Sequence, residues 1–260
     1  MSRLPPIFVS HGAPTLPMDD VPAREFLSGL GKAMPHPKAI LVVSAHWETE
    51  APTVSVAAKP ETIHDFYGFP RELYDMRYPA PGAPAEASRA RKLLADAGFS
   101  ASEDAGQGLD HGAWVPLLLA WPEADVPVAQ ISIQPKLGPA HHISVGRALA
   151  PLCEEGILVI GSGGAVHNLR ALDWRNGSSN GADWARAFDD WLTEALAAGD
   201  DAALCEYRDR APNARLAHPR DEHLLPVFVA YGAGGPGSRG RRIHSSYTHG
   251  ALSLSAYSFG

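Results

Sequence analysis

Residues 39–47 read Ala-Ile-Leu-Val-Val-Ser-Ala-His-Trp, and the class of fold can be argued outward from this stretch. The continuous apolar run at 39–44, rich in β-branched residues, is typical of a strand that is buried on both faces of a parallel sheet. Similar runs occur at residues 7–10, 126–133 and 157–160. Together they predict a mostly parallel central β-sheet.

Three helical patterns accompany these runs, and each stops before a glycine, as helices commonly do. They span Pro84 to Ala97, Ile143 to Glu155 and Asp183 to Ala198. The third has apolar residues at spacings of three and four, which predicts a face packed on the sheet: Trp184, Phe188, Trp191, Leu192, Ala195 and Leu196. Alternating strands and helices predict an α/β sandwich that binds ligands beyond the carboxyl ends of its strands.

The length of 260 residues suits one sizeable α/β domain, and we expect a single domain over residues 1–260. With 45% apolar and 20% charged residues, the composition is that of an ordinary globular protein. No stretch has the roughly 18 uninterrupted apolar residues that a spanning helix needs, and the first residues contain no signal-peptide core. We therefore expect a cytoplasmic protein without a membrane partner.

Charge and cysteine content exclude several kinds of site. The net charge of −7 argues against a nucleic-acid partner, because phosphate binding needs clustered basic residues. The basic run Arg239–Arg242 is short and is interpreted as a solvated loop rather than an anion site. Cys153 and Cys205 are the only cysteines, too few for a disulfide framework or a thiolate cluster. Any metal must therefore be bound through nitrogen and oxygen.

Two further segments have recognisable patterns. Residues 60–82 are rich in Pro, Gly, Tyr and Phe without periodicity. An ordered connection of that length is usually functional, so we expect a lid or a pocket wall. Residues 251–259 alternate apolar and small polar residues, which predicts a closing strand with one face buried.

Histidines follow three of the strand-like runs. His11 follows the first run, His46 the second, and His167 lies beyond the run at 157–160. In a parallel sheet these ends share one edge, and the small residues nearby let the imidazoles turn into a crevice. We interpret the three as a ligand set. Other histidines are expected at the surface or around the site: His36, His141, His142, His218, His244 and His249, with His64 in the aromatic segment.

A fourth ligand is expected in Asp221-Glu-His-Leu-Leu-Pro226, where acidic residues before an apolar run suggest the start of a helix. Either Glu222 or His223 could complete the site. Neutral imidazole suits both Zn(II) and Fe(II), and two histidines with one carboxylate are typical of non-haem iron oxygenases. The pattern permits either metal.

His111 lies beside Asp110 and between Gly108 and Gly112. Its ordinary pKa is near the working pH, so it could act as an acid or base, with the neighbouring carboxylate fixing its tautomer. The alternative is a turn in which Asp110 caps the following helix.

The glycine-rich residues 161–164 lack the spacing and the lysine of a phosphate-binding loop. Ser162 is not flanked as in a nucleophile elbow, which argues against a serine hydrolase. We expect these glycines to let the backbone pass close to the metal.

With these motifs, the chain resembles the LigB-type class III extradiol ring-cleaving dioxygenases, most closely the subgroup acting on DOPA and other catechols. The resemblance runs nearly end to end. The matching motifs are Ser10-His-Gly-Ala-Pro14, Ser44-Ala-His-Trp47, Ile63-His-Asp-Phe-Tyr-Gly-Phe-Pro70, Tyr74-Asp75, Tyr78-Pro-Ala-Pro-Gly82, Leu109-Asp-His-Gly112, Val166-His-Asn-Leu-Arg170 and Glu222-His-Leu-Leu-Pro226. One departure is Ala13, where the first motif often has Ser, a difference that we expect to remove a hydrogen bond behind the ligand.

The resemblance implies one catalytic domain with one metal ion per chain, Fe(II) for activity or Zn(II) as bound. His11 and His46 would be ligands, and His223 is favoured over Glu222. In zinc-bound relatives the residue matching His167 joins the metal. A catechol would lose its protons to His167 or His111 and be cleaved with O2 to a muconic semialdehyde.

Aromatic residues that flank the motif histidines could wall a flat ring, although packing explains each equally well: Trp47, Phe66, Tyr67, Phe69 and Trp114. Two other functions compete with ring cleavage. One is a zinc-dependent hydrolase or lyase on the same scaffold, since a histidine-rich site suits Zn(II) and an activated water. The other is a metal-storing or sensing protein without turnover.

Overall fold

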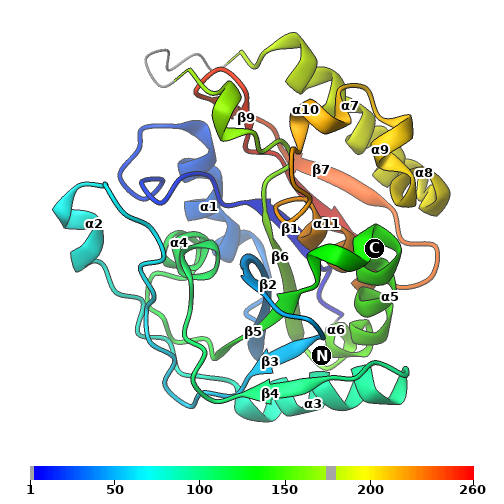
Figure 1. The fold of residues 1–260 in the computed structure, drawn as a ribbon. Coiled ribbons are helices and arrows are strands. Elements are labelled where there is room, and N and C mark those ends of the chain that lie inside the picture. Colours follow the sequence, from blue (N-terminus) through cyan, green and yellow to red (C-terminus); the bar gives the residue numbers. More distant parts are fainter. Residues whose placement is uncertain (1–2, 174–179) are drawn as a thin grey trace.

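In the structure, a computed structural model that describes residues 3–173 and 180–260, eight strands form one sheet (Figure 1). Their order across the sheet is β4-β3-β5-β2-β6-β1-β10-β7. The strands are β1 (Ile7–Ser10), β2 (Ala39–Glu48), β3 (Thr53–Ser55), β4 (Ser102–Asp104), β5 (Val128–Ile133), β6 (Ile157–Gly163), β7 (Gly240–His244) and β10 (Ala256–Phe259).

The centre of this sheet is parallel, as predicted. Strands β5, β2, β6 and β1 run in one direction, while β3 and β10 flank them in the antiparallel sense. All four predicted strands are therefore confirmed and lie side by side. The second is longer than predicted, because β2 continues to Glu48 and contains His46.

Helices cover both faces of the sheet, and the strands contribute side chains to two hydrophobic cores, one on each face. In β2, Ile40 and Val42 pack in one core with α1 (Pro22–Ala33) and α4 (His111–Ala120). Leu41 and Val43 pack in the other core. That second core includes residues of α3 (Pro84–Asp96), α5 (Gly138–Leu149), α7 (Asp183–Ala198) and α11 (Leu225–Ala233). Burial on both faces explains why these strands have no polar alternation.

Two of the three predicted helices agree with the sequence patterns, whereas the third begins earlier, at Gly138, and is divided at a proline. Helix α7 has the predicted bounds and ends at Gly199, whose φ of 69° is the left-handed conformation that glycine adopts easily. The single helix predicted over Ile143–Glu155 is instead α5 followed by α6 (Pro151–Glu154). Pro151 lacks the N–H that would continue α5, so the pattern is broken there.

Both predictions for the C-terminal part need correction. The closing strand is divided: β9 (Leu252–Ser253) pairs with β8 (Tyr247–Thr248), and β10 then enters the main sheet. The basic run expected in a solvated loop lies largely in β7, where Arg242 Nη1 is 3.1 Å from Asp190 Oδ1. Short helices complete this half: α8 (Asp201–Cys205), α9 (Tyr207–Arg210) and α10 (Ala214–Ala217).

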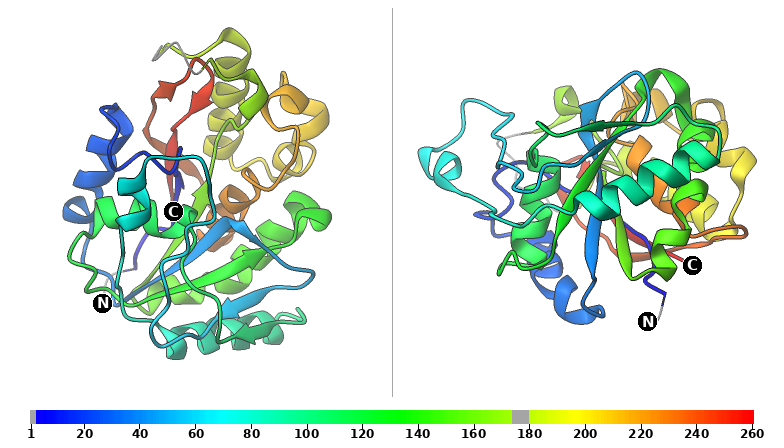
Figure 2. Two further views of the ribbon diagram at one scale, coloured as in Figure 1. Left: turned by 60° about the vertical axis from the view of Figure 1, so that its left-hand side comes forward. Right: turned by 90° about the horizontal axis from the view of Figure 1, so that it is seen from below.

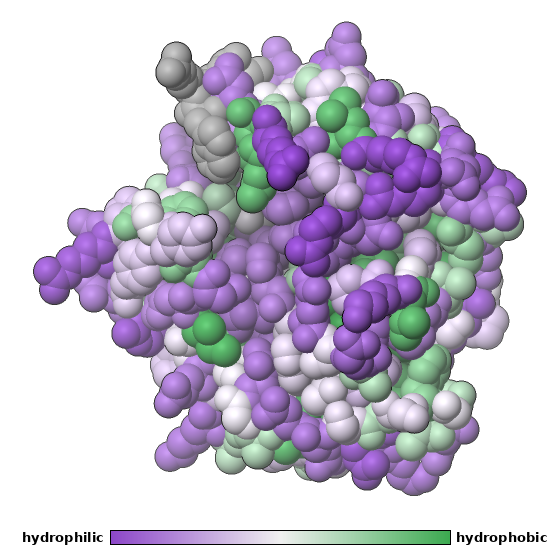
Figure 3. Space-filling model, viewed as in Figure 1, coloured by the Kyte–Doolittle hydropathy of each residue, from purple (hydrophilic) through white to green (hydrophobic). Residues whose placement is uncertain are grey.

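The segment 60–82 projects from the side of the sandwich, with the short helix α2 (Arg71–Asp75) at its outer end (Figures 1 and 2). Among the described residues, no helix is both long and apolar enough to span a bilayer. On the face seen in Figure 3, hydrophobic residues lie scattered among hydrophilic ones.

Candidate metal centre

Three neighbouring strands bring the predicted histidines to one edge of the sheet. His11 directly follows β1, His46 lies near the end of β2, and His167 follows β6, which pairs with both other strands. His223 comes from the turn before α11. The parallel arrangement therefore places these side chains together, as the strand-end argument predicted.

The four imidazoles are in contact. His11 Nε2 and His46 Nε2 lie 3.2 Å apart. His11, His46 and His223 each offer a nitrogen within 4.8 Å of the others. The ring of His167 is stacked on that of His223, with 3.4 Å between centroids. Three nitrogens this close together could bind a single metal ion.

Glycines in β6 and directly after it allow the segment of His223 to lie close to the strand. The backbone N–H of Gly164 donates to His223 O at 2.8 Å. A Cβ at Gly163 would come within 2.1 Å of that same oxygen, and a Cβ at Gly161 within 2.2 Å of Pro226 O. The structure gives the expected close approach of the backbone a specific partner: these glycines admit the segment that carries His223.

A buried serine orients His11. Ser162 Oγ lies 3.1 Å from His11 Nδ1, and its hydroxyl donates to Gly112 O. Since the serine's one proton is used there, Ser162 accepts from His11 Nδ1–H, which leaves the Nε2 lone pair for a metal. Sequence reasoning considered Ser162 only as a nucleophile and missed this supporting role.

The two candidates for the fourth ligand lie side by side. Glu222 Oε1 is 3.1 Å from His223 Nδ1. In this arrangement the carboxylate supports the imidazole, and Nε2 of His223 remains available. Glu222 also groups with His167 and His223 as a set of possible donor atoms.

His111 adjoins the centre, but its carboxylate partner is not its neighbour in sequence. His111 Nδ1 lies 2.9 Å from Asp65 Oδ1, which also accepts from the His111 backbone N–H at 2.9 Å. Asp110 instead caps α4 by accepting from Ala113 N. The capping alternative therefore holds for Asp110, and Asp65 is the partner that sequence reasoning missed.

Burial favours the neutral form of the four clustered imidazoles, those of His11, His46, His167 and His223. It is the main cause that lowers the pKa of His46 to about 3 and that of His167 to about 4, with the nearby His111 adding to both effects. The pKa values of His11 and His223 are lowered well below the usual range for the same reason, burial first and neighbouring histidines second.

The pKa of Asp65 is lowered, although the side chain is partly buried. Desolvation alone would raise its pKa, but its contacts with His111 outweigh this and lower it to about 2. An ionised carboxylate therefore lies beside the neutral imidazole of His46. Such a donor set fits Fe(II) or Zn(II), both of which bind neutral histidine nitrogen.

A cavity of about 220 Å³ opens on the histidines. Its other walls are mainly apolar, formed by Gly12, Ala13, Pro14, Phe66, Phe69, Leu169 and Leu252. Of the five aromatics expected to line it, only Phe66 and Phe69 do so. Trp47 and Trp114 are buried elsewhere, and Tyr67 is 91% exposed. The segment 60–82 is thus a pocket wall, as predicted.

Among the remaining histidines, two are core residues rather than surface ones. His142 Nε2 accepts from Gln134 N, and His218 Nε2 lies 2.9 Å from Ala165 O. Both side chains are buried, and burial is the main cause that lowers the pKa of His142 to about 4 and that of His218 to about 3. Both partners are backbone groups, and the residues around His142 and His218 give no sequence signal for them.

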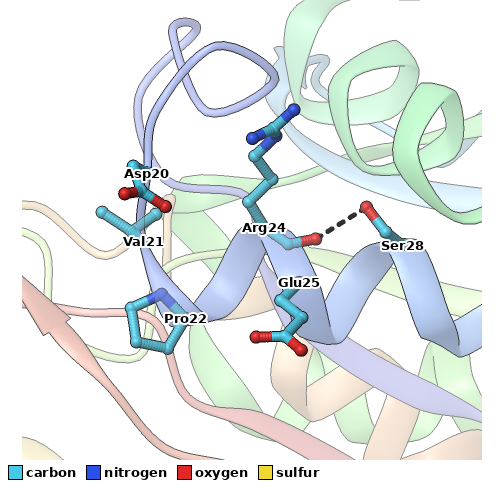
Figure 4. A pocket seen from close by; sticks show the side chains of 6 residues that line it. All are labelled: Asp20, Val21, Pro22, Arg24, Glu25 and Ser28. Atoms are coloured by element: carbon cyan, nitrogen blue, oxygen red, sulfur yellow. Dashed lines mark hydrogen bonds between the residues drawn. The ribbon is translucent and has the colours of Figure 1, made fainter.

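A wider hollow lies at the start of α1 (Figure 4). Its lining side chains are mostly exposed, and the one hydrogen bond drawn there, from Ser28 Oγ to Arg24 O, is local to the helix. It contains no converging buried donors. The histidine cavity is the better candidate for chemistry.

Comparisons with known proteins point to one family. Residues 5–260 match the family model described as the catalytic LigB subunit of aromatic ring-opening dioxygenase. A 4,5-DOPA dioxygenase extradiol of Beta vulgaris is 48% identical, over 97% of this chain and 95% of that protein. Its namesake in Escherichia coli is 40% identical over 89% and 86%. The crystal structure of an uncharacterized Escherichia coli K12 protein superposes with a TM-score of 0.81 at 32% identity, covering 99% of this chain and 100% of that one.

Proposed function

This chain belongs to the LigB family and is an extradiol aromatic ring-opening dioxygenase, and we propose that its substrate is a catechol that it cleaves to a muconic semialdehyde. The observation that carries this proposal is the convergence of four neutral imidazoles at the base of a small apolar cavity. A catechol would offer two oxygens to a metal at the histidines and a flat apolar ring to the apolar walls, so it fits both parts of the cavity.

The metal would be Fe(II) during turnover, one ion per chain, with Zn(II) as the other ion that the donors accommodate. His11, His46 and His223 would hold it, and His167, stacked on His223, would join them or accept a substrate proton. When bound, Fe(II) supplies the redox chemistry that lets O2 react with the aromatic ring.

His111 would move a proton at the catechol hydroxyl. Its Nδ1 faces Asp65, so the opposite nitrogen, Nε2, is the atom available to the cavity that His111 lines. The negative charge of the carboxylate would favour the Nδ1–H tautomer and the imidazolium that forms when Nε2 accepts a proton. This nearly buried His111 would therefore act as the base that activates the substrate.

The apolar walls would orient the ring and exclude water. Phe66 and Phe69 lie on one segment, and Leu252 lies on another. Exclusion of water prevents side reactions and leaves the reacting groups in one orientation. Apart from histidines, the described lining contains no ionisable side chain, so recognition would depend on the ring and its hydroxyls.

The substrate is proposed to be a catechol of the DOPA type, because the relatives from Beta vulgaris and Escherichia coli carry that name. The amino-acid part would extend from the open side of the cavity. A DOPA side chain that remains in solvent keeps its charges hydrated, which avoids the cost of burying them in an apolar wall.

The test is to load the metal-free protein with Fe(II) under anaerobic conditions and then supply O2 and L-DOPA. We expect uptake of one O2 per catechol and a product that absorbs in the visible. Zn(II)-loaded protein is the control and should consume no O2. Hydrolysis of an ester or amide by the Zn(II) form, with no O2 uptake by the Fe(II) form on any catechol, would support the zinc hydrolase instead.

A further inference from the structure

One carboxylate, that of Asp65, lies against both a proposed metal ligand and the proposed base. We infer that Asp65 is a positioning residue that orients His46 and His111 together and ties both to the wall of the substrate cavity. This inference rests on the proposed function and adds to it a residue outside the ligand set.

The two carboxylate oxygens have different partners. Oδ1 lies 2.9 Å from His111 Nδ1 and accepts the His111 backbone N–H at 2.9 Å, while Oδ2 lies 3.5 Å from His46 Nδ1. An ionised carboxylate carries negative charge and has no proton to donate. Its charge beside each Nδ1 therefore favours the tautomer that carries the proton on Nδ1. For His46 this leaves the Nε2 lone pair toward His11, where the proposed metal would bind.

The position of Asp65 in the chain connects the metal centre to the cavity wall. Phe66, the next residue, and Phe69 both line the cavity. The same segment is held against the start of α4, because Ile63 N donates to Leu109 O at 2.7 Å and Trp114 Nε1 donates to Ile63 O at 3.0 Å. A shift of the wall would therefore also move the carboxylate that faces the two histidines.

A simpler role for Asp65 is to anchor the loop through the His111 backbone N–H alone. The two roles are separated by Asp65→Asn, which preserves the shape but has only one acceptor oxygen. If the amide oxygen stays on His111 N–H, the amide N–H₂ group faces His46 Nδ1. A donor at that position favours the other tautomer of His46, with its proton on Nε2, and this tautomer cannot bind a metal through that atom.

The experiment measures metal affinity and steady-state kinetics on the same preparations. Metal-free Asp65→Asn is titrated with Zn(II) against a competing chelator, which requires no turnover. We expect its affinity to fall by about 10- to 100-fold, the usual effect of removing a residue that orients a metal ligand. With Fe(II) and L-DOPA, kcat should fall by at least about tenfold while KM changes less than about threefold, because Phe66 and Phe69 remain in place.

The matched control is Glu72→Gln, an exposed carboxylate on α2 in the same segment, which should behave as wild type. Unchanged metal affinity and kcat in Asp65→Asn would overturn the inference, as would a rise in KM alone, which is the result of a loop anchor. Should Asp65→Asn not fold, Asp65→Glu replaces it. That variant keeps the charge but displaces both oxygens, and wild-type kcat and affinity would again overturn the inference.

The outcome is independent of the proposed substrate. If wild type cleaves no catechol, the proposed function fails, while the metal titration still tests whether Asp65 orients His46. If wild type is active and Asp65→Asn equals it in both measurements, only the role of Asp65 fails.

Discussion

Ser162→Ala is expected to weaken metal binding although Ser162 is not a proposed ligand. The Ser162 hydroxyl lies between His11 Nδ1 and Gly112 O, and all of these groups are buried. Its removal leaves the carbonyl without this donor and the imidazole N–H without its acceptor. Each buried polar group left unsatisfied costs about 1–3 kcal/mol.

His11 can avoid part of that cost by moving its proton to Nε2, but this removes the lone pair that would bind the metal. With 1.4 kcal/mol equal to a factor of ten, an effect of about 1–3 kcal/mol predicts a loss of metal affinity of roughly 5- to 150-fold. The assay is competition between the metal-free protein and a chelator for Zn(II), accompanied by thermal unfolding of the same metal-free samples.

Ser144→Ala is the matched control, because Ser144 is exposed on α5 and its hydroxyl bonds only to its own helix, at Ala140 O. It should leave metal affinity unchanged. Wild-type affinity in folded Ser162→Ala would refute the reasoning, since it would mean that the tautomer of His11 does not depend on Ser162.

Three further outcomes are expected. His11→Ala and His46→Ala each lose bound metal, because too few donors remain; near-full occupancy by metal analysis would remove that residue from the ligand set. His223→Ala lowers Zn(II) affinity more than Glu222→Gln does, and the reverse order in the same titration would make Glu222 the ligand. His111→Ala retains its metal but turns over catechol about 10² to 10⁴ times more slowly; parallel loss of metal would make His111 a ligand, and unchanged turnover would leave it without a catalytic role.

The strands and the convergence of the proposed ligand histidines could be predicted because both depend on local patterns. A buried parallel strand is a continuous apolar run, and the ends of such strands share an edge, so His11, His46 and His167 had to approach one another. The proline that divides α5 from α6 is likewise a signal in the local sequence. The apolar pattern continues past Pro151, however, and so predicts one helix where the structure has two.

The groups that orient the ligands could not be predicted in this way. Asp65 lies 46 positions before His111, and Ser162 lies 50 positions after Gly112. Each pair meets only because separate segments converge at the edge of the sheet. Asp110 was the nearer carboxylate in sequence, but a side chain at the start of a helix can satisfy the helix's own N–H groups, and that local use prevailed.

The first turn of α4 explains why these supports act together. Asp110 accepts from Ser44 on β2 and from Gln130 on β5, and Gly112 O accepts from Ser162 on β6. A Cβ at Gly112 would lie only 2.6 Å from Ser44 Oγ and 3.0 Å from His46 Cδ2. The turn therefore approaches the strands more closely than any residue with a side chain would allow. Because strands and helix are rigid elements, the proposed ligands are held in place without a metal, and less ordering would have to accompany binding.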